Sequence, residues 1–209
     1  MQTALVLALV CVGAHAQFSE GGKQSMVNAH NAVRSSIAKG EYVAKGTKKD
    51  SATNMLKMKW DNSLAQSAQN YANGCPMQHS PDKSYGENLF WAYSSSPITD
   101  LDKYVQSAVD TWVSEFQMFG WNSNKFTTAL WNTGIGHATQ VAWSATGQVG
   151  CGAKNCGADS VRVGSYKATI VCQYKVPGNY LFKNIYNSGA KCSACPAGTS
   201  CEQSSGLCA

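Results

Sequence analysis

The chain has 209 residues, of which 44% are apolar and 14% are charged, and its formal net charge is +5. This length suits one domain with a substantial core and a small appendage. Its lysines are scattered, whereas nucleic-acid binding requires a dense basic face with interleaved aromatic residues, so no nucleic-acid partner is expected. A weak preference for anionic membranes or glycans is compatible with the charge.

The first 16 residues have the pattern of a secretory signal peptide. Residues 4–12 form an apolar run too short to span a bilayer, and Ala14-His15-Ala16 fits a signal peptidase site. Cysteine parity supports this interpretation independently, because removal of Cys11 with the leader leaves an even set, which in a secreted chain indicates disulfides. We therefore predict a secreted, extracellular protein cleaved before Gln17. A buried N-terminal strand is the alternative.

Apolar residues recur at helical spacing in three segments of the first half. They predict helices over 22–38, from Asp61 or Asn62 to 72, and from a cap at Thr99 or Asp100 to 119. The apolar stripe of the third helix contains Glu115. Because burial of an unpaired carboxylate is costly, Glu115 is expected to have a hydrogen-bonded or ionic partner. His30, on the first helix, is interpreted as a packed or capping side chain rather than a ligand.

Shorter patterns predict strands and loops. Alternation at 56–60 predicts a half-buried strand, and 75–99, rich in Ser, Pro, Gly and Asn, is predicted to be a loop. Period-two patterns predict strands at 148–153, 161–163 and 166–174, ended by a turn at 177–179. His137 lies in a short apolar segment at 136–143, where it needs a specific partner. From Gly189 the apolar periodicity is lost, and the tail is expected to be held by disulfides.

Several motifs occur together and in order. They are His30-Asn31-x-x-Arg34, Cys75 with His79-Ser80, Tyr85-Gly86-Glu87-Asn88-Leu89, Gly136 to Trp143, and Cys172 to Tyr180. Over about Lys23 to Tyr180 the chain resembles the CAP (SCP/TAPS) superfamily, and especially the secreted venom-allergen-like, or activation-associated, proteins of parasitic nematodes. The resemblance implies an α+β fold, a three-layer α/β/α sandwich with a short disulfide-rich tail. The expected organisation is a signal peptide at 1–16, a CAP domain at 17–188 and a cysteine-rich, hinge-like tail at 189–209.

The resemblance also implies a central cleft lined by His79, Glu87, Glu115 and His137. Two imidazoles with carboxylates form a legitimate set for a divalent cation, so zinc or magnesium bound through His79 and His137 is one interpretation. The interpretation that we prefer requires no cofactor: the four residues form a hydrogen-bonded polar cluster that fixes the cleft.

An aromatic segment points to apolar ligands. Phe119, Trp121 and Phe126 have the spacing of the caveolin-binding motif, in the region where sterol-binding CAP proteins carry that loop. We predict a flexible loop that displays these aromatic side chains and binds sterol. The alternative is that they pack back onto the sheet.

Eight cysteines allow 105 pairings, and the sequence alone does not choose among them. Relatives imply the pairs Cys75–Cys156, Cys151–Cys172, Cys192–Cys201 and Cys195–Cys208. Zinc at Cys192-x-x-Cys195 is the competing interpretation, which secretion disfavours.

The leading functional hypothesis is a non-enzymatic secreted protein that binds sterol or fatty acid and modulates host tissue or immunity. No catalytic residue is assigned, because Ser80 only adjoins His79 in sequence and neighbouring side chains seldom face each other. One alternative is a metal-assisted hydrolase at the histidine–glutamate cleft. Another is a protein ligand for a host immune receptor, and a membrane surface is a further candidate partner.

Overall fold

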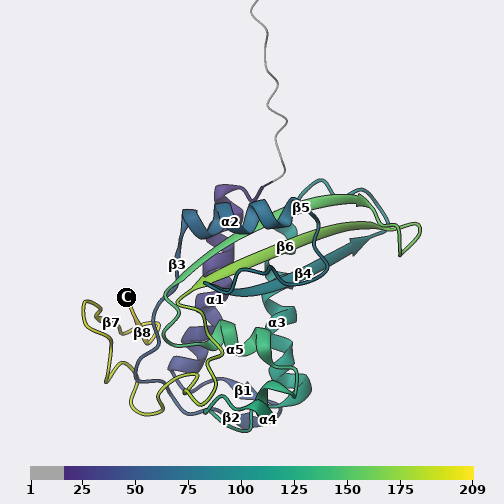
Figure 1. Cartoon of the computed structure of the whole chain (residues 1–209). Coiled ribbons are helices and arrows are strands. Elements are labelled where there is room, and N and C mark those ends of the chain that lie inside the picture. Colours follow the sequence, from purple (N-terminus) through teal and green to yellow (C-terminus); the bar gives the residue numbers. More distant parts are fainter. Residues whose placement is uncertain (1–16) are drawn as a thin grey trace, which may run out of the picture.

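A computed structural model describes residues 17–209 (Figure 1), so the predicted signal peptide at 1–16 lies outside the described residues. The helices are α1 (Glu20–Ala38), α2 (Asn62–Ala72), α3 (Val105–Phe119), α4 (Thr128–Trp131) and α5 (Gly136–Ala142), with a 3-10 turn at Asp102–Tyr104. The strands are β1 (Val43–Ala44), β2 (Thr47–Lys48), β3 (Lys59–Trp60), β4 (Gly86–Ser94), β5 (Gln148–Ala158), β6 (Tyr166–Lys175), β7 (Cys201–Glu202) and β8 (Leu207–Cys208). Among these elements, no helix has the length and apolar character needed to cross a membrane.

The central sheet has the strand order β3-β5-β6-β4 and is mainly antiparallel, with only β3 and β5 paired in parallel. Helix α2 packs over β5 and β6 on one face, whereas α1, α3 and α5 pack together on the other (Figure 1). This arrangement is the predicted three-layer α/β/α sandwich. The sheet and the second helix layer together hold the core that positions the site.

Glycines in β5 let α2 lie directly on the sheet. A Cβ atom on Gly152 would lie 2.3 Å from the backbone of Gln69, closer than any side chain tolerates. The Gln69 side chain then completes the contact, because its amide donates to the Ala153 carbonyl at 2.8 Å and accepts from the Ala153 N–H at 3.0 Å. Asp61 caps this helix by accepting from Leu64 N, as the sequence predicted.

Two of the predicted loop and strand assignments are wrong. Segment 75–99 contains strand β4, which pairs with β6 from Gly86 to Ser94, so tertiary pairing overrides the flanking turn residues. Residues 161–163 are not a strand but the turn of the β5–β6 hairpin. There the Asp159 carboxylate accepts hydrogen bonds from the Val161 and Arg162 N–H groups and ends the ladder.

The third helix also begins differently from the prediction. The Asp100 carboxylate accepts from Asp102 N and forms a local turn, and α3 starts only at Val105, without a side-chain cap. The predicted half-buried strand at 56–60 shrinks to the two residues of β3, at the edge of the sheet.

Four disulfides join the pairs that the family resemblance implied. They are Cys75–Cys156, Cys151–Cys172, Cys192–Cys201 and Cys195–Cys208. Because both Cys192 and Cys195 are oxidised, no thiolate is left there for zinc. The tail packs onto the body through buried Leu207, a hydrogen bond from Cys208 N to Met55 O at 2.8 Å, and an ion pair between Lys57 and Glu202 at 2.8 Å.

Candidate functional site

The structure brings together all four residues of the predicted cleft. Glu87 is the second residue of β4, Glu115 lies on α3, His137 lies in the first turn of α5, and His79 lies in the loop between α2 and β4. The two imidazole rings face each other, with centroids 6.0 Å apart. A small cavity of about 210 Å³ between them is lined by all four residues.

Glu87 organises the His79 side of the cleft. Its Oε1 atom accepts from His79 Nδ1 at 2.9 Å and from Ser80 N at 2.8 Å, and its Oε2 atom accepts from Gln173 Nε2 at 3.2 Å. Burial alone would raise the pKa of Glu87, but these hydrogen bonds outweigh it and hold the pKa below its ordinary value. The carboxylate is therefore charged at neutral pH and fixes the orientation of the ring.

Glu115 does the same on the opposite side. One carboxylate oxygen accepts from His137 Nδ1 at 2.6 Å, and the other accepts from the Ala138 N–H at 3.0 Å. The second bond satisfies a free N–H in the first turn of α5. Glu115 on its apolar stripe and His137 in its apolar segment thus have the partners that their positions required.

These contacts define the tautomers of both histidines. A carboxylate accepts hydrogen bonds, so the Nδ1 atom of each ring carries the proton and, in the neutral ring, Nε2 carries a lone pair. Neither Nε2 atom of His79 or His137 has a hydrogen-bond partner within residues 17–209. The cleft therefore presents two oriented imidazole nitrogens to a ligand.

A buried hydrogen-bond chain holds the His137 backbone in place. Asn88 Nδ2 donates to His137 O and to the Tyr174 hydroxyl, both at 3.2 Å. The hydroxyl is also 2.9 Å from His30 Nε2, whereas His30 Nδ1 is 2.8 Å from Met26 O. His30 is thus a packed, structural residue, as the sequence predicted, and it connects α1 to the cleft wall.

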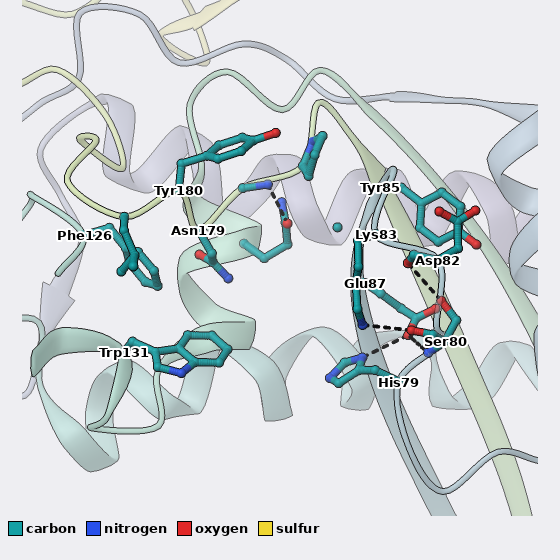
Figure 2. Close-up of a pocket in the computed structure, with 15 residues that line it drawn as sticks. His79, Ser80, Asp82, Lys83, Tyr85, Glu87, Phe126, Trp131, Asn179 and Tyr180 are labelled. Atoms are coloured by element: carbon teal, nitrogen blue, oxygen red, sulfur yellow. Dashed lines mark hydrogen bonds and ion pairs between the residues drawn. The ribbon is translucent and has the colours of Figure 1, made fainter. Parts of the chain in front are cut away.

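A larger pocket of about 450 Å³ adjoins the cleft and shares His79 and Glu87 with it. Figure 2 shows Phe126, Trp131 and Tyr180 on one side of this pocket, facing His79 and Glu87 on the other. The pocket is also lined by Trp131, Tyr180 and Leu181, which were not predicted from the sequence. Tyr180 belongs to the motif from Cys172 to Tyr180, but nothing in the sequence near Trp131 distinguishes Trp131 from an ordinary core aromatic residue.

The predicted display of three aromatic residues on a loop is wrong for two of them. Trp121 and Phe126 are 2% and 1% exposed, and only Phe119 reaches solvent. Trp121 stacks on Phe116 with ring centroids 4.2 Å apart and lies under the Lys49 ammonium at 4.9 Å. The physical reason is that aromatic surface of this size gains more by packing against the core than by facing water. Phe126 instead contributes to the pocket wall.

The residues near the cleft do not form a nucleophile–base pair. The Ser80 hydroxyl donates to the Asp82 carbonyl rather than to His79. All eight cysteines of the described chain are in disulfides. The arrangement can therefore bind a cation or hold a polar group, but it offers no activated side chain for attack on a substrate.

Comparison with known proteins agrees with the fold and the motifs. The cysteine-rich secretory protein (CAP) family matches residues 27–174. The chain is 37% identical to Ancylostoma secreted protein of Ancylostoma caninum over 195 residues, which cover 89% of this chain but 43% of that protein. The chain thus spans less than half the length of that curated relative.

Solved structures of similar proteins share this fold. The structure of BmVAL-1 superposes with a TM-score of 0.83 at 31% identity, covering 95% of this chain and 97% of that one. The crystal structure of NaASP2 with Zn²⁺ superposes with a TM-score of 0.81 at 33% identity, covering 91% and 96%. The chain belongs to the CAP family of cysteine-rich secretory proteins.

Proposed function

We propose that this protein is secreted and binds a small amphipathic lipid, a sterol or a fatty acid, in the pocket beside the histidine–glutamate cleft. The main support for this proposal is that the pocket has an apolar side and, facing it, a polar side. Trp131 and Tyr180 offer exposed apolar surface beside the nearly buried Phe126, and His79 and Glu87 offer hydrogen-bonding groups at the opposite side. A volume of about 450 Å³ lies within the range of small-molecule sites.

Replacing Trp131 by Ala should weaken lipid binding about ten-fold, because an indole face in contact with a ligand contributes roughly 1.5 kcal/mol. Equilibrium titration with a fluorescent sterol and a fluorescent fatty acid measures the loss. Phe119→Ala is the matched control, since Phe119 is a similarly exposed aromatic residue outside the pocket lining. Loss of binding in Phe119→Ala alone would place the lipid site at the aromatic segment 119–126 rather than in this pocket. No binding by the parent protein would exclude the proposed function.

A divalent cation at His79 and His137 is a second candidate function. Each ring is oriented by a carboxylate on Nδ1 and has Nε2 free of protein contacts in the described chain, which is the usual arrangement of metal-binding histidines. Two protein ligands make an open, weak site rather than a four-ligand structural one. The solved relative NaASP2 was crystallised with Zn²⁺, which supports the proposal. A bound cation would supply Lewis acidity or an anchor for an anionic head group.

Replacing Glu115 by Gln should lower the affinity for zinc by about 10- to 100-fold, because it removes the charged partner that orients His137. Isothermal titration of the purified protein with Zn²⁺ measures the change. The control is Asp110→Asn on the exposed side of the same helix, where Gln106 is the carboxylate's only hydrogen-bond donor among residues 17–209. Equal affinities in Glu115→Gln and the parent would exclude the assigned geometry.

We favour binding over hydrolysis because the Ser80 hydroxyl is bonded away from His79. Modulation of host tissue or immunity through a receptor is a further proposal about the protein's role. Binding to host cells that survives Trp131→Ala and His137→Ala would assign that role to another surface.

A further inference from the structure

Three consecutive apolar side chains are exposed in the loop that follows β6. Tyr180, Leu181 and Phe182 are 50%, 48% and 64% exposed. The loop is part of the yellow-green segment between β6 and the tail in Figure 1. Adjacent large apolar residues exposed together usually mark an interaction surface, whereas a single exposed one needs no explanation.

The backbone presents Phe182 in an unfavourable conformation. Its φ angle is +66°, a left-handed value that a bulky L-residue rarely adopts. The loop is nevertheless held firmly, because Phe182 N donates to Phe126 O at 2.7 Å and Phe126 N donates to Lys183 O at 2.8 Å. Glycine would relieve the backbone and remove the exposed ring. Neither folding nor solubility accounts for a phenylalanine at this position.

The surroundings of this loop are basic and adjoin the lipid pocket. A second hollow of about 550 Å³ is lined by Phe182, Lys125 and Lys183 among others, and no carboxylate is among its lining residues in the described chain. Tyr180 lines both this hollow and the pocket proposed to bind lipid. Apolar side chains flanked by lysines fit the boundary between lipid head groups and acyl chains, where lysine stems lie along apolar surface and their ammonium groups contact phosphate.

We propose that the loop Tyr180–Phe182 docks this protein on an anionic phospholipid bilayer. The apolar side chains enter the interface, and Lys125 and Lys183 contact the head groups. Docking turns the mouth of the lipid pocket toward the bilayer, so that an amphipathic ligand passes between them without crossing bulk water. Only this last step rests on the proposed lipid-binding function.

Cosedimentation with vesicles tests the docking surface. The full chain is mixed with vesicles of phosphatidylcholine alone or of phosphatidylcholine with phosphatidylserine, and we expect preferential binding to the anionic vesicles. Phe182→Gly and Phe182→Asn both tolerate a positive φ and should bind about ten-fold more weakly while unfolding at the same temperature or higher. Lys125→Glu with Lys183→Glu should lose the preference for phosphatidylserine, at about five-fold or more for each lysine.

Val163→Ser is the matched control. Val163 is 93% exposed in the β5–β6 turn, beyond the opposite end of β6 from the loop, so its loss should leave vesicle binding unchanged. Equal binding by Phe182→Gly and the parent protein, or an equal loss in Val163→Ser, would overturn the proposal, as would a parent protein that binds neither vesicle. Binding to vesicles by a protein that takes up no sterol or fatty acid would retain the docking surface and exclude the lipid pocket. Lipid uptake without vesicle binding would retain the lipid pocket and exclude the docking surface.

Discussion

Replacing Arg34 by Met should lower the free energy of unfolding by roughly 5 kcal/mol, which approaches the whole stability of many domains. Arg34 lies fully buried on α1, and the five N–H groups of its guanidinium make six contacts with backbone carbonyls, so that one N–H is shared between two of them. The acceptors are the carbonyls of Leu56, Val141, Trp143, Ser144 and Thr146, at 2.6 to 3.1 Å. Methionine would fill the space and satisfy none of them.

The size of the effect follows from the carbonyls that lose their only partner. Trp143 O and Ser144 O also accept from backbone N–H groups, but Leu56 O, Val141 O and Thr146 O have no other partner among residues 17–209. Each buried carbonyl left without a donor costs about 1–3 kcal/mol. Arg34 is also the cation that faces the carboxyl end of α5, the helix that carries His137.

Urea or guanidinium unfolding at pH 7 measures the loss. Burial lowers the pKa of Arg34 to about 9, so the side chain is still charged at that pH. The control is Arg162→Met, where the guanidinium lies on the surface over the Tyr93 ring and the expected change is within about 0.5 kcal/mol. A loss below about 1 kcal/mol in Arg34→Met would show that water or rearranged backbone can replace the guanidinium.

The helical spacing of apolar residues predicted helix α1, but it did not predict that the buried face of this helix carries two polar side chains. The apolar residues that recur at helical spacing in this segment are Met26, Ala29, Val33 and Ile37; all are buried except Val33, which is half-buried. His30 and Arg34 are fully buried. A hydrophobic pattern assigns charged residues to solvent, and the carbonyls that stabilise Arg34 come from segments more than 20 residues away. Only the family motif singled these residues out.

For the cleft, too, the sequence predicted which residues take part but not how they contact one another. Family motifs named His79, Glu87, Glu115 and His137, and the structure brings all four together. The motifs could not tell that both carboxylates bond to Nδ1, because this depends on the relative placement of α3, β4 and α5. The role of Trp131 could not be predicted for the same reason. Whether an aromatic residue lines a pocket or fills a core depends on how segments distant in the sequence pack.

The second large expected effect is a loss of folding stability at acidic pH. Stability should fall by about 2 kcal/mol between pH 7 and pH 5, and by about 3 kcal/mol by pH 4, through His30 alone. Burial lowers the pKa of His30 from 6.5 to about 4, more than offsetting the bond to the Met26 carbonyl, while the nearby Arg34 charge lowers it further. In the unfolded chain the same ring takes up its proton near pH 6.5. This part of the stability is therefore complete above pH 6.5 and is lost as the pH falls toward 4.

His30→Gln should remove this part of the pH dependence while lowering stability at pH 7. Urea unfolding at several pH values measures the slope, and the NMR signal of the His30 ring in the parent protein should not titrate between pH 7 and pH 5. A variant with the parent's slope would contradict the prediction. Proton uptake would also act on the cleft, because neutral His30 Nε2 accepts from the Tyr174 hydroxyl and a protonated ring cannot. A protonated ring would donate to the Tyr174 oxygen instead, and the buried Tyr174 O–H would lose its acceptor. Because that oxygen also accepts from Asn88, which holds the His137 backbone, the change loosens the wall of the site.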